Sequence, residues 1–345
     1  MKESTKEVKC VIWDLDHTLW DGILVEADDI QLKPGIKEIL HTLDARGILH
    51  SIASKNNYPD AMAKLKAFGL EEYFLYPEIN WDAKSFGVGK IQKNLNFAMD
   101  TIVFIDDQPF EREEVKSVHP EITCMDALDY QKILALPRFN PRFITQDSSR
   151  RRSMYMDDIK RKVEEETFRG PSEVFLASLD MKFLIHEARE EDLKRAEELT
   201  VRTNQLNATG RTYDYDELNA FRLSPSHRLL VCELTDKYGS YGKIGLALIE
   251  INQDSWHLKL LLMSCRVMAR SVGTVLMSYI MMETKKVGKI LLADFKKTDR
   301  NRQMLVSYKF SNFKEVSSDE SGNILFQNDL STIQPFPPYI DVRIL

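Results

Sequence analysis

The sequence lacks the features that mark several common classes of protein. It has four cysteines (Cys10, Cys124, Cys232 and Cys265) without a C-x-x-C pair or zinc-type spacing, and its seven histidines form no H-E-x-x-H motif. This pattern argues against disulfides and a zinc site and predicts free thiols in a reducing cytoplasm. No apolar run approaches the roughly 20 residues of a membrane span, so we expect no membrane segment.

Excess positive charge is also missing. The chain carries 47 Lys and Arg against 53 Asp and Glu, a net charge of −6 at pH 7. Nucleic-acid binding usually requires a basic face, so we expect no nucleic-acid partner. What is present is 345 residues, 43% hydrophobic and 29% charged, which is an ordinary globular composition with material for two domains.

Short apolar segments alternate with helical patterns over the first 130 residues. Strands are predicted at 9–16, 48–55, 73–79 and 100–107, and helices at 34–47, 60–69, 89–98 and 110–118. Strands separated by helices predict an α/β fold with a doubly wound parallel sheet and right-handed crossovers. Sheets of this type bind ligands at the carboxyl ends of their strands.

The pattern changes after Pro137. The next 40 or so residues are highly charged and predict an interdomain connection with one exposed helix. A second, mixed α/β domain follows, with a hairpin predicted around 237–242. We therefore expect domains at 1–145 and 181–345, joined by a charged helical connection at 146–180.

Polar side chains follow three of the predicted strands. These are Asp14 and Asp16, Ser54 and Lys55, and Asp106 and Asp107. Adjacent carboxylates are unfavourable unless a cation or a reacting group compensates them. They could be solvated turn residues, but three coincident polar strand ends favour a site. Carboxylates beside a hydroxyl and an ammonium group suit Mg²⁺-dependent phosphoryl transfer.

The same residues resemble the signatures of the haloacid dehalogenase (HAD) superfamily. DLDHT at 14–18 is similar to the first signature, SIASKN at 51–56 to the second and VFIDDQ at 103–108 to the fourth, while Lys84 in INWDAKS is similar to the lysine of the third. Lys90 is the competing choice for that lysine.

The resemblance implies a role for each matched residue. Asp14 is the expected nucleophile and metal ligand, and Asp16 the general acid/base whose backbone carbonyl also meets Mg²⁺. The remaining expected roles are phosphoryl binding by Ser54 and Lys84, metal binding by Asp106 and Asp107, and substrate binding by Thr18, Lys55 and Asn56.

The short segment 21–32 leaves no room for a large cap domain after the first signature. A capless HAD site is open and suits a bulky or macromolecular substrate. Trp20 and Trp81 either wall this site or belong to the core.

The stretch SCRVMARSVGTVLM at 264–277 follows an apolar strand and opens a helix. A plain strand–turn–helix with solvated arginines would explain it. It also resembles the pyrophosphate loop of GNAT acyltransferases, with Arg266, Ala269 and Ser271 at the matching positions. Downstream, Asn301 and Tyr308 match the Asn and Tyr that face the acyl-thioester there. Cys265 is either a buried apolar side chain or a thiol that accepts an acyl group.

A capless HAD-like domain followed by a GNAT-like mixed α/β domain resembles the FkbH-like family, from about Lys9 to Val316. The resemblance implies a Mg²⁺-dependent phosphatase and glyceryl transferase. Such an enzyme takes a three-carbon acyl phosphate such as 1,3-bisphosphoglycerate and loads the phosphopantetheine thiol of an acyl carrier protein in polyketide or mixed peptide-polyketide biosynthesis. The alternative is a stand-alone HAD phosphatase on a phosphometabolite or phosphoprotein, with a structural second domain.

An acidic carrier protein would need a basic docking face. The candidates are Arg266, Arg270, Lys296, Lys297, Arg300 and Arg302. If they flank one groove, they would steer an acidic partner. The alternative is that they are ordinary solvated charges.

Overall fold

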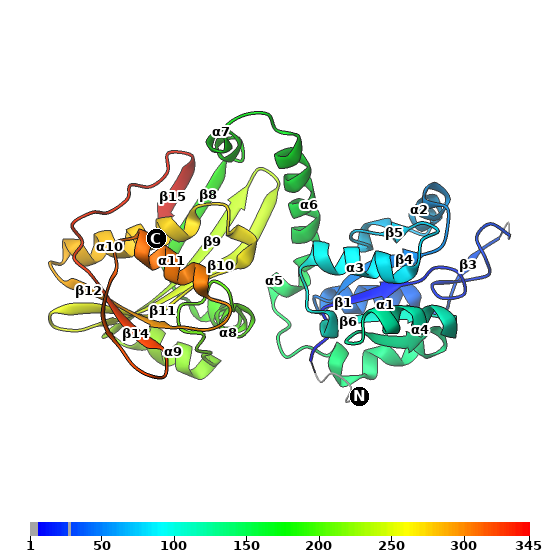
Figure 1. Cartoon of the computed structure of the whole chain (residues 1–345), viewed down its shortest axis with the longest axis horizontal. Coiled ribbons are helices and arrows are strands. Elements are labelled where there is room, and N and C mark those ends of the chain that lie inside the picture. The colour runs from blue at the N-terminus through cyan, green and yellow to red at the C-terminus, as the bar shows by residue number, and fades with distance from the viewer. Residues whose placement is uncertain (1–5, 27–28) are drawn as a thin grey trace. The chain divides into compact units, whose positions relative to one another are not determined.

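The computed structural model describes residues 6–26 and 29–345 (Figure 1). Contacts divide the chain into two compact units, Met1–Asp158 and Ile159–Leu345. The division falls within the connection expected at 146–180, and the boundaries at 145 and 180 stay predictions. Among the described residues, no helix combines the length and apolar character needed to cross a membrane.

The first unit is built on a five-stranded parallel sheet in the order β5-β4-β1-β6-β7. Its strands are β1 (Cys10–Trp13), β4 (Leu49–Ser54), β5 (Glu78–Ile79), β6 (Ile102–Asp106) and β7 (Thr123–Asp126). β1 lies at the centre and is buried along its whole length, as an apolar strand covered on both faces must be. The predicted parallel α/β fold is confirmed.

Helices connect these strands: α1 (Ile36–Ala45), α2 (Tyr58–Ala67), α3 (Lys84–Leu95) and α4 (Pro109–Val118). Local sequence explains two of their starts. Asn57 caps α2 by accepting a hydrogen bond from the Asp60 N–H, and Pro109 opens α4, where a missing N–H costs nothing. The chain crosses from β5 to β6 on the other side of β1, so the order reverses between β1 and β6. A crevice for ligands forms at such a reversal.

Some local predictions were wrong. The strand expected at 73–79 is reduced to the two residues of β5, because Tyr76 has a left-handed φ of 51° and Pro77 has no N–H to pair. The hairpin of β2 (Trp20–Asp21) and β3 (Gln31–Leu32) was not predicted, and neither was β7. These strands are too short to show a clear alternation.

The charged connection forms α5 (Gln146–Ser149), α6 (Arg151–Thr167) and α7 (Ser172–Ala177). The prediction of one exposed helix was wrong, because α6 has buried side chains. Met154 is 4% exposed and Arg161 only 1%. Arg161 is buried because its guanidinium pairs with the Asp236 carboxylate at 2.7 Å.

The second unit has an eight-stranded mixed sheet in the order β13-β14-β12-β11-β10-β9-β8-β15. Its strands are β8 (Met181–Glu187), β9 (His227–Asp236), β10 (Gly239–Ile251), β11 (Ser255–Met263), β12 (Ile290–Lys296), β13 (Lys314–Ser318), β14 (Asn323–Asn328) and β15 (Ile340–Ile344). The predicted β9–β10 hairpin is confirmed. The mixed α/β class is confirmed too, with β11–β12 and β8–β15 as its parallel pairs.

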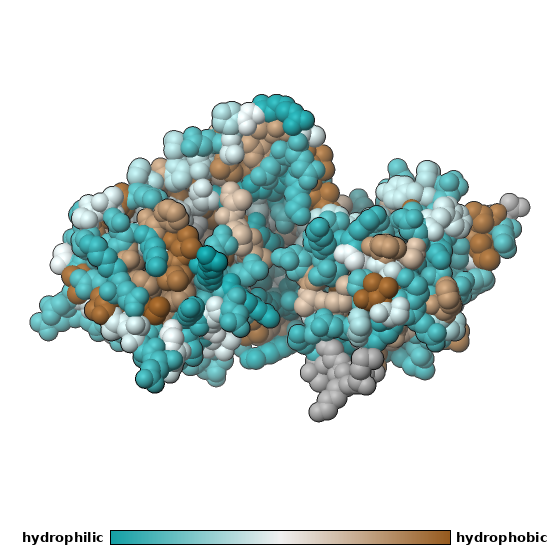
Figure 2. All heavy atoms as spheres, in the orientation of Figure 1, coloured by the Kyte–Doolittle hydropathy of each residue, from teal (hydrophilic) through white to brown (hydrophobic). Residues whose placement is uncertain are grey.

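Each face of this sheet has its own core. α8 (Leu193–Arg202) and α9 (Tyr215–Leu223) pack against one face, and α10 (Val272–Lys286) and α11 (Arg302–Phe310) against the other (Figure 1). α9, β13, β14 and β15 were not predicted, and β13 is exposed along its whole length. On the face shown in Figure 2, apolar side chains form separate patches among hydrophilic ones.

Candidate active site

The candidate site begins where β1 ends. The Asp14 N–H donates a hydrogen bond to the Ile105 carbonyl of β6, at 2.9 Å, which fixes the end of β1 beside its neighbour. Asp14 is 5% exposed and Asp106, at the end of β6, is fully buried. Two carboxylates are thus held together at the carboxyl edge of the sheet.

Lys84 lies between these two carboxylates. Its Nζ is 2.9 Å from Asp14 Oδ1 and 2.6 Å from Asp106 Oδ2. Burial alone would lower the pKa of Lys84, but the two carboxylates outweigh burial and raise it, so the side chain is an ammonium ion. Lys84 is the first residue of α3, so the helix places this charge at the site.

A third carboxylate joins this cluster. Ligand atoms of Asp14, Asp106 and Asp107 all lie within 4.8 Å of one another. Burial followed by repulsion from Asp14 raises the pKa of Asp106 to about 6, and burial followed by repulsion from Asp106 raises that of Asp107. Burial also raises the pKa of Asp14, although Lys84 and Ser54 oppose it. One ammonium cannot balance three carboxylates, so this oxygen donor set fits a divalent cation such as Mg²⁺.

Asp16 stands apart from that cluster. Its Oδ1 accepts hydrogen bonds from the Trp20 indole at 2.7 Å and the Leu24 N–H at 3.1 Å, and its Oδ2 accepts one from the Asn56 amide at 3.0 Å. The carboxylate is therefore oriented by three donors and is not one of the clustered metal-type oxygens. The expected metal contact through the Asp16 backbone carbonyl stays a prediction.

The other residues predicted for this site have different surroundings. Ser54 is 4% exposed, and its side-chain hydrogen bond to Asp14 opposes the rise in the pKa of that carboxylate. Lys55 pairs with Glu111 at 2.9 Å, while Asn56 is 2% exposed and binds Asp16. Thr18 is fully buried, and within 6–26 and 29–345 its hydroxyl has no hydrogen-bond partner. Lys55 and Asn56 thus position other side chains, and their predicted substrate contacts stay untested.

The structure separates the two candidate lysines. Lys90 is exposed and pairs with Glu78 at 3.1 Å, whereas Lys84 contacts two carboxylates. The two tryptophans also differ in burial: Trp20 belongs to the core, whereas Trp81 is 68% exposed. Sequence reasoning missed the Trp20 indole as a donor to Asp16.

Arg112 was also missed. Its Nη1 donates to the Asp106 carbonyl at 2.6 Å, and its Nη2 lies 2.7 Å from Asp126 Oδ2. It ties α4 to the ends of β6 and β7. No motif spacing indicated this contact, although the arginine follows the Asp106–Asp107 pair closely in sequence.

The loop predicted to bind a pantetheine diphosphate lies between β11 and α10. Cys265 and Ala269 are exposed, so Cys265 is not a buried apolar side chain. Arg266 donates to the Tyr241 carbonyl at 2.8 Å. Ser271 precedes α10 with a left-handed φ of 60°, and its hydroxyl lies 3.1 Å from that of Tyr339.

Two residues predicted to face an acyl-thioester are buried instead. Tyr308 is fully buried, stacks on Phe313 and donates to the Asp294 carbonyl at 3.4 Å. Asn301 is 1% exposed, and its amide donates hydrogen bonds to backbone carbonyls. Both side chains are engaged in internal contacts, and their predicted roles toward an acyl-thioester stay predictions. Arg270, predicted on a docking face, is also buried, at 8% exposure.

A segment of the chain fills the gap where β11 and β12 diverge. The two strands pair only from Ser255 to Leu258, and β11 then continues to Met263. Such an edge could otherwise pair with an extended ligand. Here the Ala208 N–H donates to the Leu261 carbonyl and the Met263 N–H to the Leu206 carbonyl, both at 2.9 Å.

The other edge of this segment, Leu206–Ala208, is also used. The Lys296 N–H donates to the Ala208 carbonyl at 3.0 Å, and the Asn301 amide donates to the Asn207 carbonyl at 3.1 Å. Asn207 and Ala208 are fully buried. An extended phosphopantetheine arm therefore does not fit between β11 and β12 in this arrangement.

Sequence comparison finds a family similarity within the first unit. The family model described as haloacid dehalogenase-like hydrolase matches residues 22–118. Over these residues the chain is similar to haloacid dehalogenase-like hydrolases. The match includes Ser54, Lys84 and Asp106 but begins after Asp14 and Asp16, whose placement comes from the structure. No curated protein sequence matches the chain.

Solved structures add further similarities. The N-terminal part of BF1531 from Bacteroides fragilis, described as containing a phosphatase domain complexed with Mg, is 30% identical over 39% of this chain and 41% of its own, with a TM-score of 0.35. The ribosomal-protein-S18-alanine N-acetyltransferase from Escherichia coli is 15% identical over 45% of this chain and 97% of its own, with a TM-score of 0.34. The match thus spans less than half of the Bacteroides chain.

Proposed function

We propose that this chain is a Mg²⁺-dependent phosphatase of the haloacid dehalogenase type. The observation that carries this proposal is the cluster of buried Asp14 and Asp106 with half-buried Asp107, in which Lys84 supplies the ammonium. A phosphoryl group brings further negative charge, so a cation held by these carboxylates is required before it can enter.

Each side chain then has a distinct task. Asp14 attacks phosphorus through a carboxylate oxygen, and the bond from phosphorus to the leaving oxygen breaks. Lys84 offsets the charge on the phosphoryl oxygens, and Asp16, oriented by Trp20 and Asn56, gives the leaving oxygen its proton. Asp16 then takes a proton from water, the water oxygen bonds to phosphorus, and the bond from phosphorus to Asp14 breaks to release phosphate. Asp14, Asp106 and Asp107 would hold Mg²⁺, which supplies charge neutralisation when bound.

For the substrate we propose a three-carbon acyl phosphate such as 1,3-bisphosphoglycerate, with an acyl carrier protein as the acceptor. In that transfer a phosphopantetheine sulfur loses its proton and bonds to the acyl carbon. The bond from that carbon to the phosphate oxygen breaks, and phosphate leaves with the electron pair. Lys84 can stabilise this leaving phosphate as well. The resemblance to FkbH-like proteins supports this finer assignment.

A plain phosphatase is the second candidate, and one observation favours it. The segment Leu206–Ala208 fills the gap between β11 and β12, so no step of carrier loading can be routed through that gap. Under this alternative the second unit does not meet a pantetheine arm, and water takes the acyl group or the phosphoryl group.

One experiment separates the two candidates. The chain is incubated with Mg²⁺, 1,3-bisphosphoglycerate and purified carrier proteins, and phosphate release and intact carrier mass are measured together. Phosphate release that disappears in Asp14→Asn and with a chelator supports the phosphatase. Wild-type release in Asp14→Asn would sink it. Release without any change in carrier mass would leave the plain phosphatase.

If carriers are loaded, their docking face can be tested. Lys297 and Arg300 are exposed, so Lys297→Glu with Arg300→Glu should reduce loading while phosphate release stays near wild type. Reversing exposed Arg343, at the other end of the sheet order, is the matched control. Loading that survives the Lys297 and Arg300 reversals would exclude this face.

A further inference from the structure

The second unit contains a cavity of about 640 Å³ that the proposed chemistry does not use. It is walled by the α8–α9 connection, by β11 and β12, and by the ends of β13 and β14. The side chains that matter here are Arg211, Tyr213, Lys259, Asp294, Lys296 and Ser318. Its volume is that of a small-molecule site rather than of a single ion.

The wall from the α8–α9 connection is held in place by buried polar contacts. Asn207 Oδ1 accepts hydrogen bonds from the N–H groups of Thr209, at 3.2 Å, and Gly210, at 2.9 Å. Asn207 itself is fixed in the sheet by the contacts that fill the β11–β12 gap. Arg211 therefore follows a turn whose backbone is already ordered, and this order lowers the entropic cost of binding a ligand there.

The acidic side chains of the cavity already have partners. Asp294 lies 2.6 Å from both His257 Nε2 and Lys259 Nζ. Although burial alone would raise its pKa, these two groups hold the pKa of Asp294 below its usual value. Asp319 accepts hydrogen bonds from Asn323, from the N–H at 2.9 Å and from the amide at 2.7 Å. Neither carboxylate needs a cationic ligand.

Two cations of the cavity have weaker partners. Arg211 is 57% exposed at its side chain, and its ion pair with Glu217 is long, at 3.4 Å. Lys296 is exposed and has no ion pair within 4.0 Å in the part of the chain that the structure describes. Exposed pairs of this kind contribute little, so both cations remain available to an anion.

Tyr213 lies beside these cations. The side chain is 2% exposed, lies under the Arg211 guanidinium at 4.5 Å and lines the cavity. Its hydroxyl is not one of the buried side-chain atoms that lack a hydrogen-bond partner, so it lies where a ligand in the cavity can reach it. Burial raises the pKa of Tyr213, so the hydroxyl keeps its proton and can donate to such a ligand.

We propose that this cavity binds a hydroxylated organic phosphate of about sugar-phosphate size. The phosphate would lie between Arg211 and Lys296, and the Tyr213 and Ser318 hydroxyls would contact the polar body of the ligand. Charge-assisted hydrogen bonds from two cations favour phosphate over a neutral sugar. Binding is non-covalent and does not depend on the phosphoryl-transfer site of the first unit.

The test measures binding by calorimetry in a Lys84→Ala background without Mg²⁺, so that the first unit contributes little. The probes are ribose 5-phosphate, glycerol 3-phosphate, ribose and inorganic phosphate. We expect saturable binding of one equivalent of a phosphorylated probe, weakened about tenfold or more by Arg211→Ala with Lys296→Ala. Tyr213→Phe should weaken it about threefold or more, and the control Arg343→Ala by less than about twofold.

The opposing results are equally defined. The proposal is overturned if no phosphorylated probe saturates the protein below about 10 mM, a Kd that corresponds to negligible affinity. It is also overturned if the Arg211 and Lys296 variant binds like its parent, or if inorganic phosphate binds as tightly as the organic phosphates. Phosphatase activity of that variant, with Lys84 intact, should stay at wild type, which distinguishes this test from that of the proposed function.

Discussion

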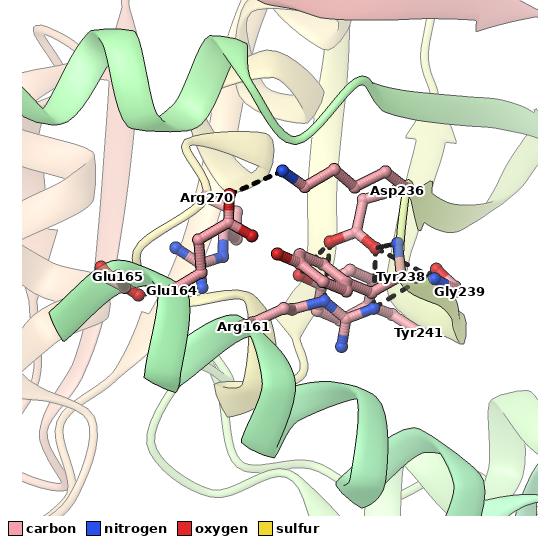
Figure 3. A network of polar contacts seen from close by, with 9 residues as sticks. Arg161, Glu164, Glu165, Asp236, Tyr238, Gly239, Tyr241 and Arg270 are labelled. Carbon is pink, nitrogen blue, oxygen red and sulfur yellow. Dashed lines mark hydrogen bonds and ion pairs between the residues drawn. The ribbon is translucent and has the colours of Figure 1, made fainter. Parts of the chain in front are cut away.

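Two buried cations, one in each unit, show how charge balance separates a reactive site from a structural one. Lys84 faces two carboxylates at 2.9 and 2.6 Å, with a third, Asp107, in the same cluster. Arg161 pairs with the carboxylate of Asp236 through two bonds at 2.7 and 2.8 Å (Figure 3).

The remaining contacts of Asp236 complete the contrast. Its oxygens also accept hydrogen bonds from the N–H groups of Tyr238 and Gly239 and from the Tyr241 hydroxyl, and Arg161 lies over the Tyr241 ring at 3.9 Å (Figure 3). This network gives the buried Asp236 carboxylate a cation and satisfies both of its oxygens. The Lys84 cluster is left with excess negative charge, which a bound cation would remove.

The largest expected effect is on catalysis. Lys84→Ala should lower phosphatase turnover by about a thousandfold or more, because the ammonium stabilises charge that develops in the transition state. The measurement is kcat/KM with saturating Mg²⁺. Lys90→Ala is the matched control and should stay within about twofold, since Lys90 forms only an exposed pair with Glu78. The reverse order of severity would refute the assignment of the site.

Much of the site around Lys84 could be predicted from the sequence alone. The polar ends of β1, β4 and β6 could be read from apolar segments followed by acids, and parallel topology places such ends at one edge. Lys84 was harder, because nothing in the sequence shows whether it or Lys90 starts α3 beside the sheet. The orientation of Asp16 by Trp20 and Asn56 depends on the unpredicted β2–β3 hairpin and was not foreseeable.

The second unit was less predictable, for a physical reason. Asn301, predicted to face an acyl-thioester, is instead buried, and its amide donates to the backbone carbonyls of Asn207 and Lys296. Hydrophobic periodicity does not report such contacts, since it follows side-chain polarity and not backbone pairing. Arg161 was misplaced on an exposed helix for the same reason: a buried charge is visible only with its partner, and Asp236 lies far along the chain.

The next largest effect should be a loss of stability on breaking the buried Arg161–Asp236 pair. Arg161→Met should destabilise the second unit by about 3–5 kcal/mol, because it leaves the buried Asp236 carboxylate without its cation. Amide hydrogen exchange in β9 and β10 reads this local free energy of opening. Combining it with Asp236→Asn should cost less than the sum of the two changes, since no uncompensated charge remains.

The same helix provides a matched control. Lys237 pairs with Glu164 of α6 at 2.7 Å, but both side chains are about one-third exposed. Lys237→Met should cost less than about 1 kcal/mol, as exposed pairs do. Equal costs for Arg161→Met and Lys237→Met would mean that burial does not decide the strength of these pairs.

A smaller effect should follow from loosening the β11–β12 gap. Asn301→Ala removes amide hydrogen bonds to the carbonyls of Asn207 and Lys296, so we expect a loss of about 1–3 kcal/mol in unfolding free energy. Urea denaturation checks the value, with the exposed Asn252→Ala as control. Coenzyme A should not bind the wild type, and saturable binding that competes with contacts of Leu206–Ala208 would show that this segment is not a fixed part of the sheet.

The smallest effect concerns a third cluster, His186 with Asp192 and Glu233. His186 Nε2 lies 3.7 Å from Glu233 and Nδ1 lies 3.8 Å from Asp192, whose other oxygen is 2.6 Å from Lys243 Nζ. With His186 protonated, two cations face two carboxylates. This balance resembles that of Arg161 rather than that of Lys84, so we expect a pH-dependent structural role.

The sign of that dependence follows from the pKa shifts. Glu233 and Asp192 raise the pKa of His186, and His186 in turn lowers that of Glu233. The folded state therefore favours the imidazolium, and its stabilisation is complete below the ordinary histidine pKa near 6.5 and is lost as pH rises through the raised value. The unfolding free energy of the wild type minus that of His186→Gln should fall as pH rises from near 6.5 through the raised pKa, by less than about 1 kcal/mol because Glu233 is partly exposed. A flat profile for His186→Gln would mean that the imidazole stays neutral and that the cluster keeps an excess of negative charge, as the Lys84 cluster does.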